Sequence, residues 1–341
     1  MITEQLINTA RILVANHKGL LAMDESVGTC NKRFAALSIP QTVEMRRSYR
    51  EMIVTTPGLG ESISGAILFD ETIRQQKSDG TPFIKVLSDA GIIPGIKVDM
   101  GAKPLAGFPG EKVTEGLDGL RARFAEYRAM GARFAKWRAV IAIDNGIPSR
   151  GCIEANAHAL ARYAALCQEA GLVPIVEPEV LMDGAHSLQQ CLAVTKEVLH
   201  TVFEQLYKQH VSLEGMLLKP NMILSGLAAK FQDPEKIVAE NTVNFLLGAV
   251  PATVPGIAFL SGGQSTELAS ARLNQMNKQY KAVLPWALTF SFGRALQQPA
   301  LEIWRGDNSN ILAAQEALYH RAKCNRAASM GKYNNTMENI V

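Results

Sequence analysis

The 341-residue sequence has no long apolar run, and this lack argues against a membrane-spanning protein. A helix that crosses a bilayer needs about 20 consecutive apolar residues, and no stretch approaches that length. The first residues, MITEQLINTARILVANHKG, carry acidic and polar side chains within their apolar positions. We therefore expect neither a signal peptide nor a membrane anchor there.

The sequence also lacks an excess of charge of one sign. Its 35 Lys and Arg residues nearly balance its 32 Asp and Glu residues, and the formal net charge is +3. No basic cluster is present that would indicate a nucleic acid or an anionic membrane as a partner. A hydrophobic share of 47% is ordinary for a soluble globular protein with a sizeable core.

Cysteines and clustered histidines are scarce as well. The five cysteines are odd in number and widely spaced, which predicts free buried thiols in a reducing compartment and hence a cytoplasmic location. The six histidines are scattered, with no pair spaced to hold Zn²⁺, so we expect no metal and no cofactor. We interpret these histidines as surface or helix-packing residues.

Eight short apolar runs alternate with helical sequence along the chain. Each is apolar enough to be buried on both faces, as parallel strands are. The expected strands are 19–24, 63–70, 93–99, 133–140, 172–180, 215–222, 256–263 and 286–293.

The segments between these strands carry helix boundary signals. One helical segment closes on Gly171 and another on Gly131, each directly before a strand. A third begins at Ser187 with Gln190 three residues later, which is the spacing of a capping box.

Eight strand–helix units without a linker predict a single-domain (β/α)8 barrel, a TIM barrel, over residues 1–325. We expect a C-terminal helix and a mobile tail over 326–341. A doubly wound open sheet is the alternative, but its nucleotide-binding form places G-x-G-x-x-G after the first strand, and AMDESVGTC lacks it.

Polar residues collect where the expected strands end, and barrel enzymes build their sites at these ends. A structural salt bridge is the simpler explanation for any one of these residues, but the joint pattern predicts a charged site in the mouth of the barrel. The residues are Asp24, Asp70, Glu71, Lys97, Asp99, Lys136, Arg138, Glu177, Glu179, Lys219, Asn221, Ser261, Gly262, Gly263, Ser291 and Arg294.

Three of these residues, Lys97, Lys136 and Lys219, interrupt apolar strands with an ammonium group. An exposed lysine has a pKa near 10.4, so a neutral amine at pH 7 requires about 4 to 5 kcal/mol of bias against its charged form. Burial and a neighbouring ammonium supply such a bias, which favours one lysine becoming a nucleophile that forms a Schiff base with a ketone or aldehyde. Glu177 and Glu179 lie two apart on one strand, so both can face the site as acid and base.

Two glycine-containing turns suggest phosphate sites. FLSGGQS places Ser261, Gly262 and Gly263 in a turn whose N–H groups can bind an anion. The segment DESVGTCNKR follows the first strand and offers a second such turn. Together with Arg294 and Lys97, the two turns suggest a ligand with a phosphate at each end.

Seven motifs, in this order and spacing, resemble the class I fructose-1,6-bisphosphate aldolases. The motifs are LAMDES, GIKVDMG, FAKWRAV, PIVEPEVL, LLKPNM, FLSGGQS and WALTFSFGRALQ, and the resemblance extends from about residue 3 to about residue 333. It implies a (β/α)8 barrel, usually a homotetramer, that cleaves fructose 1,6-bisphosphate to dihydroxyacetone phosphate and glyceraldehyde 3-phosphate without a metal. It also implies a part in glycolysis or gluconeogenesis, and carbon fixation stays open.

The resemblance implies roles for matching residues. Lys219 would form the Schiff base, Glu177 would act as the general acid and base, and Asp24 would take the proton of the C4 hydroxyl. Lys136 would support these steps, with Glu179 oriented toward the site. The implied phosphate-binding residues are Ser261, Gly262, Gly293 and Arg294 for the 1-phosphate, Ser26, Thr29 and Lys97 for the 6-phosphate, and Lys32, Arg33 and Arg138 for added positive charge.

The tail departs from the family pattern. Animal-type members end in a tyrosine that helps to protonate the enamine intermediate, whereas this sequence ends in NNTMENIV with Val341 last. Tyr333 matches an internal family position. We therefore expect water or another group to protonate the enamine, so that Tyr333→Phe leaves turnover nearly intact.

Three alternatives stay open from the sequence. Other Schiff-base barrel enzymes, such as transaldolase-like or deoxy-sugar-phosphate lyases, use a similar site. Sedoheptulose 1,7-bisphosphate is a second substrate that the motifs permit. A non-catalytic sugar-phosphate sensor could keep the fold, but a binder has no need of a buried amine such as Lys219.

Overall fold

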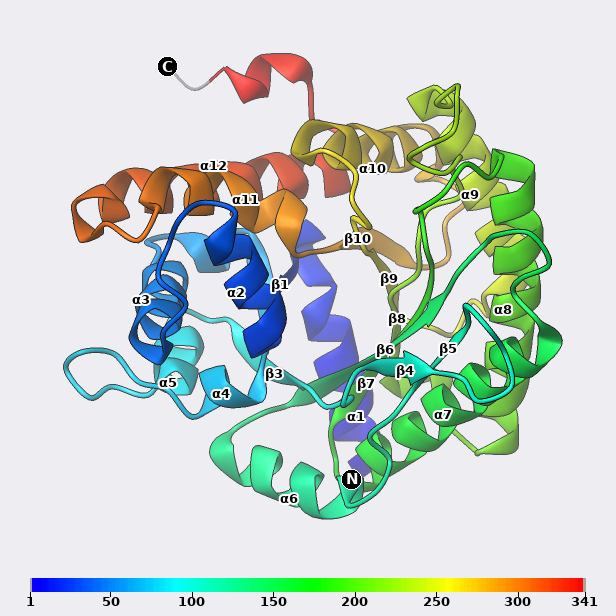
Figure 1. The fold of residues 1–341 in the computed structure, drawn as a ribbon, viewed down its shortest axis with the longest axis horizontal. Helices are drawn as coiled ribbons and strands as arrows, with labels where there is room; N and C mark the ends of the chain where they lie inside the picture. Colours follow the sequence, from blue (N-terminus) through cyan, green and yellow to red (C-terminus); the bar gives the residue numbers. More distant parts are fainter. Residues whose placement is uncertain (1, 340–341) are drawn as a thin grey trace.

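The centre of the molecule is a closed barrel of parallel strands. The computed structural model describes residues 2–339, and the barrel lies in the middle of the view in Figure 1. The order around it is β1–β10–β9–β8–β7–β6–β3–β2. The bounds are β1 Gly19–Met23, β2 Ile63–Leu68, β3 Ile93–Lys97, β6 Phe134–Ile141, β7 Val173–Val180, β8 Leu217–Leu218, β9 Gly256–Phe259 and β10 Ala287–Phe292.

All eight strands predicted from the sequence are present in this barrel, and the open-sheet alternative is wrong. Several predicted strands extend beyond the observed ones. The largest difference is at β8, where two residues form strand in place of the expected 215–222. Lys219, the residue directly after β8, lines the barrel mouth.

Helices surround the barrel. The predicted capping box of Ser187 and Gln190 is confirmed at the start of α8, and Gly131 ends α6 with a positive φ of 114°. The bounds are α1 Ile2–Leu13, α2 Val27–Ala35, α3 Val43–Val54, α4 Asp70–Ile73, α5 Phe83–Asp89, α6 Leu120–Met130, α7 Arg150–Glu169, α8 Leu188–Lys208, α9 Glu235–Ala249, α10 Thr266–Tyr280, α11 Arg294–Trp304 and α12 Ile311–Ser329.

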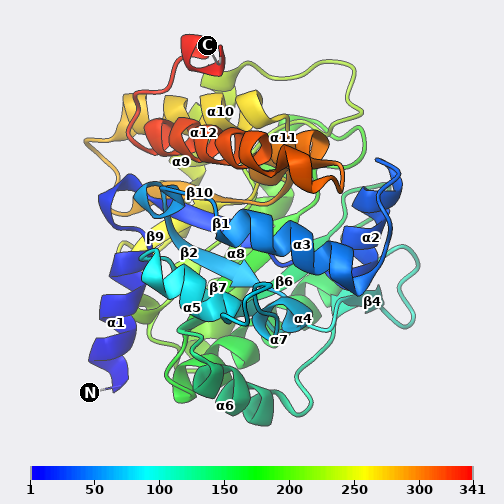
Figure 2. The same ribbon diagram turned by 90° about the vertical axis from the view of Figure 1, so that its left-hand side faces the viewer.

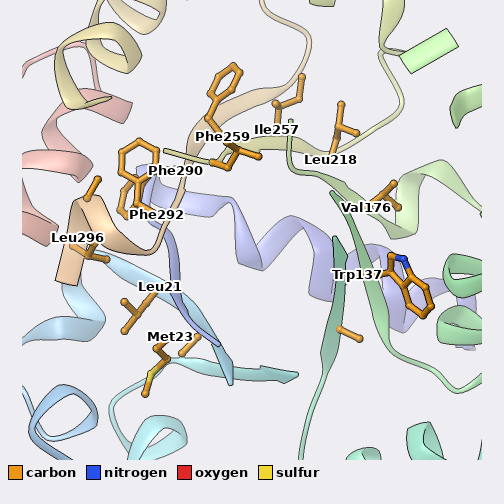
Figure 3. Close-up of a cluster of buried hydrophobic side chains, with 14 of the residues drawn as sticks. Leu21, Met23, Trp137, Val176, Leu218, Ile257, Phe259, Phe290, Phe292 and Leu296 are labelled. Carbon is orange, nitrogen blue, oxygen red and sulfur yellow. The ribbon is translucent and has the colours of Figure 1, made fainter. Parts of the chain in front are cut away.

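The strand pleat separates two apolar layers. Side chains that point outward from the strands pack under the helices, and Figure 3 shows Leu21, Trp137, Val176 and Leu218 among them. Their neighbours, such as Leu20, belong to a second cluster inside the barrel. Because side chains alternate along a strand, every second residue continues the inner series toward the mouth.

This alternation fixes which polar groups enter the mouth. On β1 the inner series is Leu20, Ala22 and then Asp24, just past the strand. On β8 it is Leu217 followed by Lys219. The same periodicity that fills the barrel floor with apolar side chains therefore places ionisable ones above it. The corresponding inner residues on β6 are Phe134, Lys136 and Arg138, and on β7 they are Val173, Ile175, Glu177 and Glu179.

The amino-terminal end of the barrel is closed by α1. Leu6, Ala10 and Leu13 of this helix join the inner apolar cluster, and the Leu13 carbonyl accepts a hydrogen bond of 2.5 Å from Ser64 Oγ near the start of β2. One end of the barrel is thus filled, and ligand access is left to the carboxyl ends of the strands.

The carboxyl-terminal helix ends later than expected. α12 lies beside α10 and α11 on one side of the barrel (Figure 2) and continues to Ser329, so the expected boundary at 325/326 falls inside it. The reason is that Ala328 and Ser329 still face the core and are buried. Ile340 and Val341 of the expected tail lie outside the described residues.

A small hairpin outside the barrel was not predicted. β4 Ala102–Pro104 and β5 Lys112–Thr114 pair antiparallel between β3 and β6. Each strand has three residues, too few for a recognisable alternation in the sequence. Within residues 2–339, no helix has the length and apolar character needed to cross a membrane.

Candidate active site

A cavity of about 640 Å³ opens at the carboxyl ends of the barrel strands. Its volume is within the range typical of small-molecule sites. Most candidate site residues from the sequence line it, but Asp70, Glu71, Asn221 and Gly263 do not. Those that line it include Asp24, Ser26, Thr29, Lys32, Arg33, Lys97, Lys136, Arg138, Glu177, Glu179, Lys219, Ser261, Gly262, Ser291, Gly293 and Arg294.

Two lysines and two carboxylates form a continuous chain of ion pairs in this cavity. Lys219 Nζ lies 3.0 Å from Glu177 Oε1, and Lys136 Nζ lies 3.0 Å from Glu177 Oε2. Lys136 Nζ also lies 2.7 Å from Asp24 Oδ2. All four side chains are buried. A proton can therefore move between neighbouring groups without leaving the site.

The environment holds these carboxylates in their charged form. Burial would raise the pKa of Asp24, but the ammonium groups of Lys136 and Lys219 outweigh it and hold that pKa well below its usual value. The pKa of Glu177 is lowered against the same burial by Lys136, Lys219 and Arg138. Burial opposes the charge of Lys136, yet Asp24 and Glu177 raise its pKa well above the ordinary value. Lys136 is thus a fixed cation, and both carboxylates are bases at rest.

Two expectations about the lysines need correction. Lys136 is the third residue of β6 and lies well inside that strand, because β6 continues beyond the end of β3 to Ile141. The expected repulsion between ammonium groups is also relieved, since Lys136 contacts two carboxylates and Lys97 lies 2.7 Å from Asp99 Oδ1. Each lysine has a carboxylate partner that sequence spacing alone did not reveal.

The start of α2 forms one side of the cavity. Ser26 caps this helix by accepting a hydrogen bond of 3.3 Å from the Thr29 N–H. The helix start directs N–H groups and a partial positive charge toward the cavity, an arrangement that suits an anion. Lys32 lines the same side and forms no ion pair within residues 2–339, whereas Arg33 is paired with Glu25 at 2.5 Å.

The opposite side combines a glycine turn with the start of α11. Gly262 has φ of 65°, a conformation that favours glycine, and a Cβ there would lie 2.5 Å from Met182 Sδ. Gly293 caps α11, and Arg294 follows it, exposed and without an ion pair in the described part of the chain. Ser291 Oγ is buried and has no hydrogen-bond partner there, which leaves it free for a ligand.

One further cation lining the cavity, Arg138, is already paired. Arg138 donates from Nε to Glu179 Oε2 in a short ion pair, and its backbone N–H donates to Asp99 Oδ2 at 3.1 Å. These pairs keep Glu179 and Asp99 in place beside the cavity. Their orientation follows from the side-by-side register of β6 and β7, which places Arg138 opposite Glu177 and Val140 opposite Glu179.

Comparison with known proteins identifies the family. A family model described as fructose-bisphosphate aldolase class-I matches residues 5–340. The chain belongs to this family. It is therefore an aldehyde-lyase that cleaves fructose 1,6-bisphosphate reversibly to dihydroxyacetone phosphate and glyceraldehyde 3-phosphate through a lysine Schiff base, as the motifs implied.

Relatives at high identity are also named as class I or cytosolic aldolases. The chain is 58% identical over 334 residues to a probable fructose-bisphosphate aldolase class 1 of Xanthomonas campestris, covering 98% of this chain and 99% of that one. It is 52% identical over 330 residues to the cytosolic fructose-bisphosphate aldolase 6 of Arabidopsis thaliana, covering 97% and 92%.

A solved aldolase has the same fold. The aldolase of Plasmodium falciparum, in a ternary complex with TRAP and a small-molecule inhibitor, superposes with a TM-score of 0.96. Its sequence is 48% identical, and the match covers 98% of this chain and 96% of that chain. The barrel is thus that of a class-I aldolase.

Sequence reasoning missed three groups in this aldolase site. Glu25 lies beside Asp24 and binds Arg33 and Arg50. Gln298 lines the cavity four residues after Arg294, so it lies one helical turn along α11. That i, i+4 spacing was the available signal for Gln298. The third, Asp99, was noted as a polar strand end but given no role.

Tyr333 lies away from this cavity. Its hydroxyl donates a hydrogen bond of 2.6 Å to Glu338 Oε1, and the ring is buried. Burial and the neighbouring Glu338 carboxylate raise the pKa of Tyr333 well above its usual value. Tyr333 therefore holds Glu338 in place within the tail, and Arg321 of α12 binds the other oxygen of that carboxylate.

One group of metal-ligating side chains lies near this anchor. Over residues 2–339, His320, Cys324 and Glu338 are the single set of three close enough to hold an ion. Both Glu338 oxygens are already bound, one by Tyr333 and the other by Arg321. The group therefore already has internal partners, and it lies outside the residues that line the aldolase cavity. All five cysteines are free and buried, as predicted.

Proposed function

We propose that Lys219 is the lysine that forms the Schiff base with the ketone carbon of the substrate. The observation that carries this proposal is the 3.0 Å separation of Lys219 Nζ from Glu177 Oε1 at the floor of the cavity. To attack a ketone, the amine must give up a proton, and Glu177 is a buried base within reach of it.

Glu177 then serves both directions of proton transfer. It takes a proton from Lys219 as the C–N bond forms, and it returns a proton to the carbinolamine oxygen as that oxygen leaves as water. The iminium that remains on Lys219 is the electron sink for the next step. Lys136 holds the other oxygen of Glu177 at 3.0 Å and so keeps the carboxylate oriented.

Asp24 removes the proton of the C4 hydroxyl. The electrons of the C3–C4 bond then move into the iminium, glyceraldehyde 3-phosphate leaves, and an enamine stays on Lys219. Protonation at C3 and hydrolysis release dihydroxyacetone phosphate. The contact of Asp24 with the fixed cation Lys136 supports this role, because it keeps the carboxylate deprotonated until the substrate arrives.

The start of α2 and the start of α11 bind the two phosphates of the substrate. Ser261, Gly262, Ser291, Gly293 and Arg294 hold the 1-phosphate, which places C2 of the substrate over Lys219. The helix start at Ser26 holds the 6-phosphate together with Thr29, Lys32 and Lys97, while Arg33 and Arg138 add positive field and Glu179 orients Arg138. The unpaired cations Lys32 and Arg294 lie one on each side, which supports this assignment.

The proposal also covers where the enzyme is located in the cell and how many copies it assembles into. The enzyme is cytoplasmic, supported by free buried cysteines and by plant relatives named cytosolic. It assembles as a homotetramer, as its family usually does. Sedimentation of the purified protein tests this, since a monomer at micromolar concentration contradicts it.

A comparison of two variants tests the assignment of roles. Lys219→Met should lose both cleavage of fructose 1,6-bisphosphate and Schiff-base formation with dihydroxyacetone phosphate. Asp24→Asn should form the Schiff base within a few-fold of wild type yet cleave at least about 100-fold more slowly. Cleavage by the wild type should persist in a metal chelator. Activity in Lys219→Met, or abolition by the chelator, contradicts the proposal.

A further inference from the structure

Arg272 lies behind the glycine turn and outside the cavity. It is the seventh residue of α10, it is 1% exposed, and it belongs to no ion pair within residues 2–339. Burying a guanidinium without a carboxylate partner costs folding free energy. The hydrogen bonds of Arg272 explain why an arginine is nevertheless present here.

One hydrogen bond connects Arg272 to the phosphate turn. Arg272 Nη1 donates to Gln264 Oε1 at 2.8 Å. The amide nitrogen of Gln264 in turn donates to the Ser261 carbonyl at 3.0 Å, and the Gln264 backbone N–H donates to the same oxygen at 3.1 Å. The side-chain amide and the backbone N–H of Gln264 thus both hold the Ser261 carbonyl. Among the described backbone hydrogen bonds, the N–H groups of Gly262 and Gly263 donate none, so they stay available to an anion.

A second hydrogen bond connects Arg272 to the neighbouring loop 225–234. Arg272 Nη2 donates to the Asp233 carbonyl at 3.3 Å, and the Asp233 carboxylate accepts from Ser225. The loop 225–234 follows β8, the strand that leads to Lys219. It also contacts the turn, because a Cβ on Gly263 would lie 3.0 Å from Leu227 Cδ1. Arg272 is therefore the shared anchor of the 261–264 turn, which lines the cavity, and of the loop 225–234, which packs against that turn.

We infer that Arg272 and Gln264 are positioning residues that hold the 261–264 turn in its phosphate-binding conformation. Arg272 fixes the side-chain oxygen of Gln264, which leaves the Gln264 amide with its donor end toward Ser261. The Ser261 carbonyl thereby points away from the cavity, and the N–H groups of Gly262 and Gly263 face the 1-phosphate. This inference rests on the proposed assignment of the turn to the 1-phosphate.

The condensation reaction tests the inference, because its two substrates use opposite sides of the cavity. Arg272→Met should raise the KM for dihydroxyacetone phosphate about tenfold, the loss expected for one hydrogen bond to a charged group. The KM for glyceraldehyde 3-phosphate and kcat should stay within about twofold. Arg272→Lys, which keeps the charge and one donor, should recover part of the loss.

Gln264→Glu is the second variant and keeps the test valid if Arg272→Met does not fold. A carboxylate at 264 still accepts from Arg272 but cannot donate to the Ser261 carbonyl. We expect the same rise in the KM for dihydroxyacetone phosphate. In the double variant Arg272→Met/Gln264→Glu, the rise in this KM should equal that of either single variant. Both substitutions break the same series of hydrogen bonds from Arg272 through Gln264 to Ser261.

Arg321→Met is the matched control. Arg321 is also buried, but it binds Glu338 and Ser270 on the far side of α10 from the turn. It should lower stability and leave both KM values unchanged. The inference is overturned if Arg272→Met raises both KM values equally, or if Gln264→Glu has no effect.

Ser261→Ala separates this inference from the proposed function. If Ser261→Ala raises the KM for dihydroxyacetone phosphate but Arg272→Met and Gln264→Glu do not, the phosphate assignment stands and the positioning role is wrong. If none of the three variants changes that KM, the turn does not hold the 1-phosphate, and both statements are wrong.

Discussion

Lys219 and Glu177 lie side by side in the barrel mouth, with Nζ 3.0 Å from Oε1. The contact joins a residue just past β8 to one inside β7, and the Lys219 N–H donates to the Val176 carbonyl at 2.9 Å. The ladder between these neighbouring strands therefore sets the distance between amine and carboxylate. Proton transfer between Lys219 and Glu177 can therefore be tested by substitution.

Replacement of Glu177 by glutamine should slow formation of the Schiff base. We expect a loss of about 10² to 10⁴ in the single-turnover rate, since a positioned acid and base contributes about that much. The rate is measured by quenching the reaction with dihydroxyacetone phosphate into borohydride at successive times. Glu179→Gln on the same strand is the control and should lose less than about tenfold, because Glu179 is paired with Arg138. Equal losses in the two variants would speak against the role of Glu177.

The two unpaired cations should act on different substrates. Arg294→Gln should raise the KM for dihydroxyacetone phosphate about tenfold in the condensation reaction, because that substrate carries the phosphate bound at the start of α11. Lys32→Gln should raise the KM for glyceraldehyde 3-phosphate and leave the other KM within about twofold. If each variant raises both KM values alike, the two phosphate sites are not separated as proposed.

Tyr333→Phe should leave turnover nearly intact. The Tyr333 hydroxyl is bound to Glu338 and the side chain lies outside the residues that line the cavity. Loss of this hydrogen bond should instead lower the free energy of unfolding by about 1 kcal/mol. Steady-state cleavage and urea denaturation measure the two effects. A loss of cleavage with retained Schiff-base formation would give Tyr333 the role of proton donor to the enamine.

Glu25 should make the stability of the protein depend on pH. Burial raises the pKa of Glu25, but Arg50 and Arg33 outweigh it, and the net pKa is lowered. A carboxyl group with a lowered pKa stabilises the fold above its unfolded value, about 4.3, and this contribution is lost as the pH falls through the folded value. Glu25→Gln should therefore lower the free energy of unfolding most near pH 7. The difference from wild type should shrink as the pH is lowered from about 5 toward 3, and a constant difference contradicts the account.

Much of the fold was predictable because parallel strands buried on both faces leave short, strongly apolar runs. The residues of the site were predictable for the same reason, since Lys136 and Lys219 stand out against apolar neighbours. Their partners were not. Glu177 reaches Lys136 across the ladder between β6 and β7, whereas only closure of the barrel brings Asp24, just past β1, to Lys136.

The burial of charged residues behind the site could not be predicted from the sequence. Arg272 lies in the polar helical segment TELASARLNQ, where an arginine predicts a solvent-exposed face. Its burial depends on the packing of α10 against α9 and α12, which sequence periodicity does not specify. Glu25 likewise lies two residues past β1 and resembles a solvated strand end, although Arg33 and Arg50 bind it.

Mapping of the trapped intermediate tests the central claim most directly. Wild-type protein is treated with borohydride in the presence and absence of dihydroxyacetone phosphate, digested, and analysed by mass spectrometry. The account predicts one substrate-dependent adduct, on Lys219, that is absent from Lys219→Ala. An adduct on Lys136, Lys97 or another lysine, or no adduct at all, would contradict it.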